Sequence, residues 1–238
     1  MIEKMTHKSR FVRWMVPHSK EEIAFVPIAS RLDNYEDIGK RILQNKQKVP
    51  IGDYTASFLY FAYCGPKVSD KPITKNVRQI MENEGFLIFN INLSTKNGIY
   101  VVQDENAIGM NHLLNINELE KKLNDGKEME NIIFSKDGKL RFAPKGTYKS
   151  GLHSSKSLAK DGRIIANCGL EGAEKLGDVS SKFSSNPYIW GVDLIDYPDQ
   201  KVFADKVSYG VIVPLVVACI SLLMGFLINL VPSQSLSH

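Results

Sequence analysis

The pattern of apolar and polar positions near the start of the chain predicts strands. The segments 10–16 and 22–29 are rich in Val, Ile, Phe and Trp, and a turn-like stretch separates them. Pro27 cannot donate a backbone hydrogen bond, so the second strand is expected at the edge of a sheet. The segment 33–47 then has apolar residues spaced for one face of a helix and ends in a basic turn. These periods predict a β-hairpin followed by an amphipathic helix.

The segment 53–64 is apolar on every side, which predicts a helix buried in the core of the domain. Asp53 stands at its start as a candidate cap, and Gly65 is expected to end it. A further helix is predicted at 74–85, where apolar residues again share one face and Gly85 marks the end.

Hairpin signals dominate the middle of the chain. Asn97-Gly98 and Asp137-Gly138 each separate two apolar runs, and both dipeptides tolerate the positive φ angles of a tight turn. A short capped helix is predicted between the hairpins at 115–126. The polar segment 147–161 is expected to be either an active or binding loop or simply a connector.

The segments 163–168, 171–183 and 187–195 read as strand, helix and strand, which predicts a right-handed βαβ unit. The fold class predicted from all these elements is α+β. In this prediction a mixed sheet is built from β-hairpins and the C-terminal βαβ unit, with an early helical cluster. A single C-terminal transmembrane helix follows.

That helix is predicted at 207–231, where no charged residue occurs. From Tyr209 to Val231 a helix would be about 34 Å long, enough for the roughly 30 Å hydrocarbon core of a bilayer. The chain is thus divided into an α+β domain (1–195), a juxtamembrane tether (196–206), the span, and a short polar tail (232–238).

Lys201 and Lys206 precede the span, whereas 232–237 carries no positive charge. Because Lys and Arg are enriched on the cytoplasmic side, the N-terminal domain is expected to face the cytoplasm, in a layout that resembles tail-anchored proteins. Ser221 and Gly225 form one small-xxx-small pair in the span. This pair is a candidate contact for a homodimer, although single pairs also arise by chance.

Composition excludes little. The hydrophobic fraction of 43% and the charged fraction of 24% are globular averages, and the net charge of +4 is mild. No RNA-binding signature is present, so no nucleic acid partner is expected. No Cys or His spacing suits zinc and no Walker or dinucleotide motif occurs, so neither a metal nor a cofactor is expected.

Candidate chemistry is concentrated at Cys168. In the predicted βαβ unit it ends a strand and precedes Gly169 and a helix N-terminus, where a thiol pKa is lowered. His153 is a candidate base and Asp193 a candidate residue to orient it, which together would form a catalytic triad. The alternative is that Cys168 is a buried structural thiol.

The sequence leaves two functions open, and a third possibility is that the chain belongs to a larger membrane assembly in which the span packs against helices of other subunits. The first is a single-pass, C-terminally anchored protein whose cytosolic domain binds or scaffolds protein partners at the membrane surface. The alternative is a membrane-tethered, thiol-dependent hydrolase or transferase that uses Cys168 and His153.

Overall fold

The structure is a computed structural model, and it describes residues 14–28, 35–65, 86–109, 114–149, 155–182, 189–197, 200–203 and 225–230. Its helices are α1 (Tyr35–Gln44), α2 (Gly52–Cys64), α4 (Ile116–Asn124), α5 (Ser155–Leu158) and α6 (Gly162–Ser180). A three-stranded sheet contains β1 (Trp14–His18), β2 (Glu21–Ile28) and β10 (Gly225–Leu230).

A larger, seven-stranded sheet has the strand order β5-β6-β7-β4-β3-β8-β9. Its strands are β3 (Phe86–Ser94), β4 (Gly98–Gln103), β5 (Lys127–Met129), β6 (Ile132–Phe134), β7 (Leu140–Pro144), β8 (Ile189–Tyr197) and β9 (Gln200–Phe203). The β3–β8 pairing is parallel and the other pairings are antiparallel, so the sheet is mixed. Helices packed on such a sheet confirm the α+β class.

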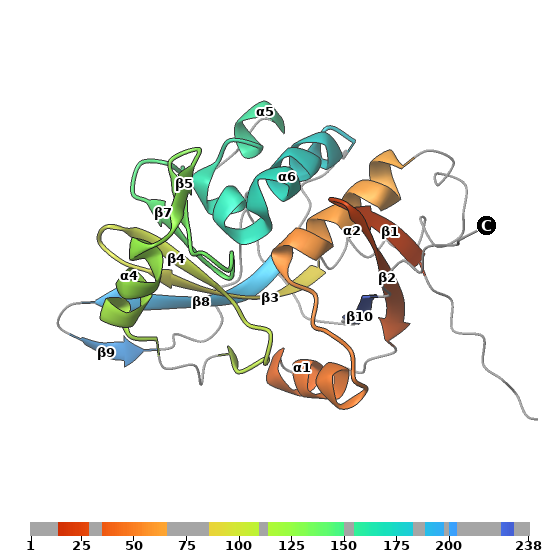
Figure 1. Ribbon diagram of the computed structural model, residues 1–238, viewed down its shortest axis with the longest axis horizontal. Helices are drawn as coiled ribbons and strands as arrows, with labels where there is room; N and C mark the ends of the chain where they lie inside the picture. Colours follow the sequence, from red (N-terminus) through yellow and green to blue (C-terminus); the bar gives the residue numbers. More distant parts are fainter. Residues whose placement is uncertain are drawn as a thin grey trace, which may run out of the picture.

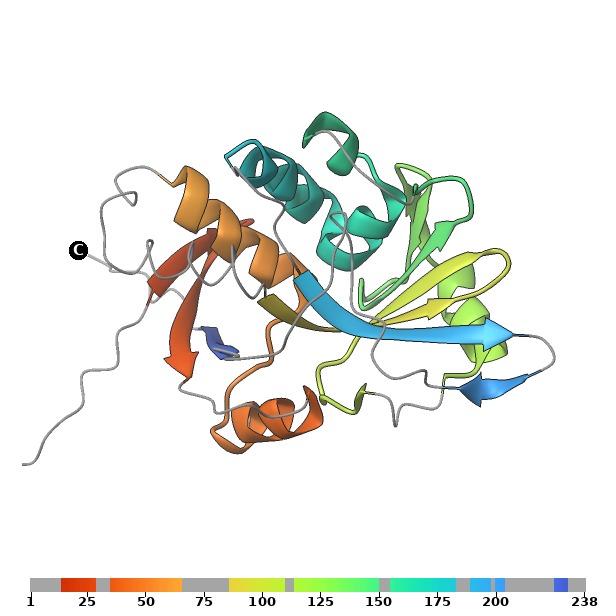
Figure 2. The same ribbon diagram turned by 180° about the vertical axis from the view of Figure 1, so that it is seen from behind.

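Helices cover both faces of this sheet (Figures 1 and 2). The helices α2, α5 and α6 lie on one face, and α1 lies on the other. Strand β3 is buried on both sides because its side chains alternate: Ile88 packs with the α2–α6 layer, Phe89 with α1, and Ile91 with the leucines of α4. The core therefore has two layers separated by β3 and β4.

The predicted hairpins are confirmed. Strands β1 and β2 pair antiparallel, β3 and β4 meet around Asn97-Gly98, and β6 and β7 meet around Asp137-Gly138. Helix α4 is also confirmed, and Asn115 caps it by accepting hydrogen bonds from the backbone N–H groups of Asn117 and Glu118. Turn and cap chemistry made these elements readable from local sequence.

Helix α1 forms where a helix was predicted. Its first residue is held by a tertiary contact: the Tyr35 hydroxyl donates to Asp104 Oδ2 at 3.0 Å. Asp104 also accepts from the backbone N–H groups of Ile108 and Gly109 at 3.0 and 2.7 Å. This buried carboxylate connects α1 to the loop that follows β4.

The prediction that Asp53 caps the second helix is wrong. The N-cap of α2 is Ile51, which makes no side-chain hydrogen bond. Gly52 is the first residue of the helix. It must be glycine because a Cβ there would lie 2.1 Å from the carbonyl oxygen of Asn167 in α6. The start of α2 thus lies against the backbone of α6, and Asp53 forms an ion pair with Arg141 instead of capping the helix.

The predicted βαβ unit is also wrong. Residues 163–168 are helical and belong to α6, and the parallel partner of β8 is β3. Asp161 caps this helix by accepting from the N–H groups of Arg163 and Ile164. A short apolar run fits a buried helix as well as a strand, and here the cap together with packing against α2 selects the helix.

Helix α6 is kinked at Gly169, whose φ of 71° and ψ of 170° are non-helical. Side-chain-bearing residues almost never adopt this conformation. A Cβ at this position would also lie 2.8 Å from Asp53 Oδ2. Both the backbone angle and the close carboxylate therefore require glycine.

Most of the predicted span 207–231 lies outside the described residues, as does the helix predicted at 74–85. Residues 225–230 are described as β10, which pairs antiparallel with β2. Strand β2 is therefore the central strand of its sheet, and the expectation that Pro27 places it at an edge is wrong, because a strand distant in sequence pairs along that side. Residues 200–203, within the predicted tether, form β9 and pair with β8. In the part of the chain that the structure describes, no helix has both the length and the apolar character to cross a membrane.

We predict that Gly169→Ala destabilises the fold more than Gly138→Ala. The two glycines have nearly equal φ angles, 71° and 73°, but a Cβ at Gly138 would have no heavy atom within 4 Å. Gly138→Ala should cost about 1–2 kcal/mol for left-handed backbone alone. Gly169→Ala should cost about 3 kcal/mol or more, because its φ of 71° and ψ of 170° are almost exclusive to glycine and because Asp53 must also move. Chemical denaturation measures both, and equal losses would contradict these two added costs.

Candidate functional site

A line of polar side chains lies between α2, α6 and the neighbouring strands. We call it the polar seam, and it comprises His18, Asp53, Ser57, Arg141, Glu171 and Lys175. Asp53 and Ser57 are four residues apart on α2, so they project from the same side of that helix. Glu171 and Lys175 are likewise four apart on α6. The seam therefore joins two helices with matching periodicity.

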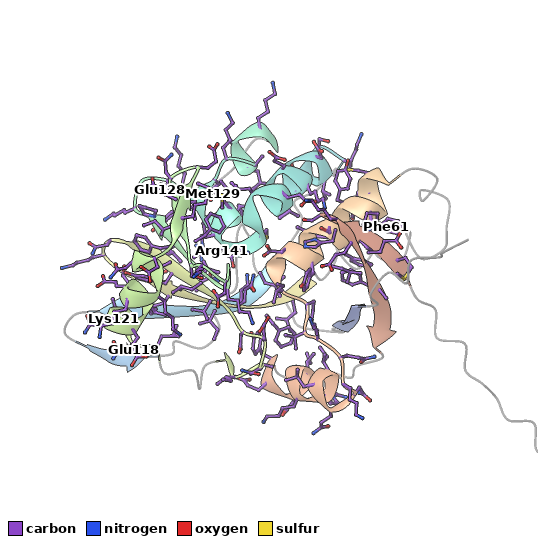
Figure 3. The ribbon with its side chains drawn as sticks, viewed as in Figure 1. Phe61, Glu118, Lys121, Glu128, Met129 and Arg141 are labelled. Carbon is purple, nitrogen blue, oxygen red and sulfur yellow. The ribbon has the colours of Figure 1, made fainter. Side chains whose placement is uncertain are left out.

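One end of the seam is a bidentate ion pair. Arg141 of β7 donates from Nη1 to Asp53 Oδ1 at 2.9 Å and from Nη2 to Asp53 Oδ2 at 2.7 Å. The two side chains are only 6% and 20% exposed. Arg141 also donates from Nη1 to the Ala166 carbonyl at 3.2 Å and from Nε to the Gly138 carbonyl at 3.1 Å. One guanidinium thus connects α2, α6 and the β6–β7 turn, and Figure 3 shows it in the interior of the molecule.

The other end of the seam is centred on Ser57. Its Oγ lies 2.8 Å from His18 Nδ1 and accepts a hydrogen bond from Lys175 Nζ at 2.9 Å. Lys175 is also paired with Glu171 at 2.6 Å. Ser19, in the β1–β2 turn, donates from its hydroxyl to Glu171 Oε2 at 2.5 Å. These contacts fasten the β1–β2 turn to α2 and α6.

Neighbouring charges and burial shift the pKa values of His18 and Glu171. The pKa of His18 is lowered, first by burial and then by the charge of Lys175, while Asp53, Glu171 and Glu21 act in the opposite direction. Ser57 Oγ accepts from the Lys175 ammonium, which can only donate, and we assign neutral His18 the tautomer in which Nδ1 accepts from the Ser57 hydroxyl. Hydrogen bonds from Lys175 and then Ser19 lower the pKa of Glu171 to about 2.

Ser57 and His18 resemble a nucleophile and its base, but the surroundings favour a structural role. Ser57 is only 2% exposed and lies inside α2. The backbone N–H groups around it are used by the helix, so they cannot form an oxyanion hole. Lys175 is held in an ion pair rather than placed as a base. The arrangement therefore ties β1, α2 and α6 together.

A ladder of buried amides lies beside the seam. Asn90 donates from Nδ2 to the Asn167 carbonyl at 2.8 Å and to its Oδ1 at 3.2 Å, and Asn167 donates from Nδ2 to Asn92 Oδ1 at 2.8 Å. All three residues are fully buried. Since unpaired buried amides are costly, this ladder fixes α6 on β3 in one position.

Of the triad predicted from the sequence, the structure describes the positions of Cys168 and Asp193. Cys168 lies in α6 and is 2% exposed, and the pKa of its thiol is raised by burial and by Asp53, against the smaller opposing effect of Arg141. His153 lies outside the described residues. Asp193 is on β8 as the register partner of Asn92, whose neighbour in the amide ladder is Asn167, the residue next to Cys168. The described backbone thus brings β8 near this part of α6, and the catalytic role stays a prediction.

The expected low thiol pKa depended on a helix N-terminus after Cys168. The thiol is instead enclosed at the kink of one helix, where desolvation opposes the thiolate. Of the other candidates, Ser221 lies outside the described residues, and Gly225 is the first residue of β10. Among the residues that the structure describes, no group of His, Cys, Asp and Glu could hold a metal ion.

Sequence reasoning missed the role of His18, Ser57, Arg141 and Lys175. One signal was available: Asp53 and Ser57 are polar positions, one turn apart, in a helix that is otherwise mostly apolar. Polar residues in a buried helix require partners. Their partners come from β1, β7 and α6, which are distant in sequence.

The comparisons with known proteins add no relative: no family model, curated protein or solved structure matches the chain. The function is therefore inferred from the geometry of the polar seam and from the sequence.

We predict that Cys168 is unreactive in the folded protein. In a Cys64→Ser/Cys219→Ser variant it is the remaining thiol, and iodoacetamide at neutral pH should label it about 100-fold more slowly in the native state than in concentrated guanidinium chloride, because burial suppresses both access and the thiolate.

The matched control is Cys168→Ser/Cys219→Ser, which leaves the half-buried Cys64. This thiol should react faster than Cys168 in the native protein. If native Cys168 reacted as fast as it does in the unfolded chain, the enclosed thiol would be refuted and the enzyme hypothesis strengthened.

Proposed function

We propose that the protein is a single-pass, C-terminally anchored membrane protein whose cytosolic α+β domain binds or scaffolds protein partners at the membrane surface. The anchor is the uncharged segment 207–231, whose length and composition suit a bilayer. In the anchored protein residues 225–230 would lie in the span and would not pair with β2 as β10 does in the structure. Anchoring confines the domain near the surface and so raises its encounter rate with other membrane-bound proteins.

The observation that carries the binding role is the structural use of the seam. Asp53 and Arg141 are charged residues of types that enzymes use in catalysis. Here their hydrogen bonds join α2, β7 and α6. A charge buried in this way stabilises one arrangement of the layers, and moving it during a reaction cycle would break the fold. This supports a rigid display domain.

Charged side chains on α4 and β5 are exposed, whereas Arg141 is buried. Glu118 and Lys121 on α4 and Glu128 on β5 are exposed and project away from the sheet (Figure 3). Exposed residues of both signs on a rigid element can form hydrogen bonds and ion pairs with a partner protein. They support contact with proteins rather than with a substrate held in a cavity.

The alternative, a thiol-dependent hydrolase or transferase that uses Cys168 and His153, gains no support from the described residues. A nucleophilic cysteine needs an accessible thiolate, whereas Cys168 is buried and its pKa is raised. The binding role is therefore the function we put forward.

The test of anchoring uses the full-length chain. The wild-type protein should stay in the membrane pellet after alkaline carbonate extraction. Leu222→Arg/Leu223→Arg should move to the supernatant, because each arginine costs about 2.5–3.5 kcal/mol at the centre of a span. Leu222→Ile/Leu223→Ile is the matched control and should stay in the pellet.

The same variants test the binding role. Proteins crosslinked to the wild type should be recovered with the isoleucine variant and be lost with the arginine variant. Recovery of the wild type in the supernatant would overturn the anchor. An identical set of captured proteins for all three would overturn a binding function that depends on it.

A further inference from the structure

The β1–β2 turn is held against the helical layer by side chains rather than by backbone pairing. His18 contacts Ser57 of α2, and Ser19 contacts Glu171 of α6 through both its hydroxyl and its backbone N–H, the latter at 3.3 Å. Strand β1 lies alongside α2 in both views (Figures 1 and 2). A few polar contacts thus decide how firmly this hairpin is held at its turn.

Apolar surface lies beneath the hairpin. Val16 and Ile23 are fully buried, and Phe25 of β2 stacks on Phe58 of α2 with ring centroids 4.6 Å apart. These side chains belong to the same core cluster as the α2–α6 interface. Lifting the hairpin would expose this surface.

We propose that His18, Ser57 and Lys175 form an acid-sensitive latch, in which protonation of His18 loosens the β1–β2 hairpin from α2 and α6. The proposal is independent of the membrane anchor and of the partner that the domain binds.

The latch works through the geometry at Ser57 Oγ. In the neutral state the Ser57 hydroxyl donates to His18 Nδ1, and Lys175 donates to the same oxygen. A proton on Nδ1 removes that acceptor and places a second cation within 2.8 Å of an oxygen that already has the Lys175 ammonium at 2.9 Å. The Ser57 hydroxyl must then turn to accept from both cations, and a like-charge repulsion is created in a partly buried site.

Charged and titratable groups face His18 from every element packed against it. They are Glu21 on β2, Asp53 and Tyr54 on α2, and Glu171 and Lys175 on α6. The carboxylates favour protonated His18, but burial and Lys175 outweigh them and the pKa is lowered. The proton is therefore bound more weakly in the folded state than in the unfolded state.

The sign of the pH dependence follows by linkage. A histidine whose folded pKa lies below its ordinary value of 6.5 contributes stability that is complete above pH 6.5 and is lost as the pH falls through the folded pKa. The pKa of Glu171 is about 2, so Glu171 stays ionised through this range and keeps its contacts with Ser19 and Lys175. Acid therefore weakens only the contact between His18 and Ser57. The hydrogen bond from Ser19 to Glu171 is kept, so the hairpin can return to its position when the pH rises.

Hydrogen exchange of the full-length protein in detergent micelles tests the latch. After correction for intrinsic exchange rates, protection of residues 14–28 should fall about fivefold from one pH unit above 6.5 to one unit below, because the folded state binds the His18 proton more weakly than the unfolded state does. His18→Asn keeps a side-chain acceptor but cannot titrate, so its protection should not change over this range. His112→Asn, the matched control, should behave as the wild type.

Unchanged protection in the wild type, or the same fall in His18→Asn, would overturn the latch. A measurement without mutation guards against a misfolded variant. Nitrogen-15 NMR should show Nδ1 of His18 unprotonated and Nε2 protonated above pH 6.5. A proton on Nδ1 at neutral pH would reverse the hydrogen bond with Ser57 and contradict the mechanism.

Discussion

A buried guanidinium must have its charge balanced, and this constraint at Arg141 organises the helical layer. Asp53 supplies the opposing carboxylate through two hydrogen bonds, and the Ala166 carbonyl of α6 takes part of the remaining donor capacity. Because removing one partner would leave an uncompensated buried charge, α2 and α6 are held to β7 as a unit. The kink at Gly169 belongs to the same constraint, since a side chain there would strike the Asp53 carboxylate.

Hydrogen bonds of other polar side chains connect further elements to the Asp53–Arg141 pair. The amide ladder through Asn167 fixes α6 on β3, and Ser57 together with Lys175 extends the seam to the β1–β2 turn. Asn90 and Asn167 in the ladder and Ser57 in the seam have hydrogen-bond partners inside the protein, which is the condition for placing polar side chains in a core. Charged residues such as Glu118 on α4 are instead exposed at the surface.

Local signals in the sequence were sufficient for much of the fold. The strand pairs, the turns at Asn97-Gly98 and Asp137-Gly138, and the buried helix α2 all follow from period and turn chemistry. Residues 163–168 were misread because an apolar run has no period that separates a strand from a buried helix. Asp53 was misread because its real partner, Arg141, is 88 positions away. Asp53 and Ser57 signalled that partners were needed, but which residues pair with them is decided only when elements distant in sequence pack together.

The central claim is that the Asp53–Arg141 pair is a structural junction, and a double-mutant cycle measures it directly. Asp53→Asn, Arg141→Met and the double variant should give a coupling free energy of about 2–3 kcal/mol in chemical denaturation, as expected of a mostly buried, bidentate pair. The cycle for Glu105→Gln and Lys139→Met, a pair whose side chains are each 50% exposed, should give less than about 1 kcal/mol. A coupling for Asp53 and Arg141 no larger than that of the exposed pair would contradict the account.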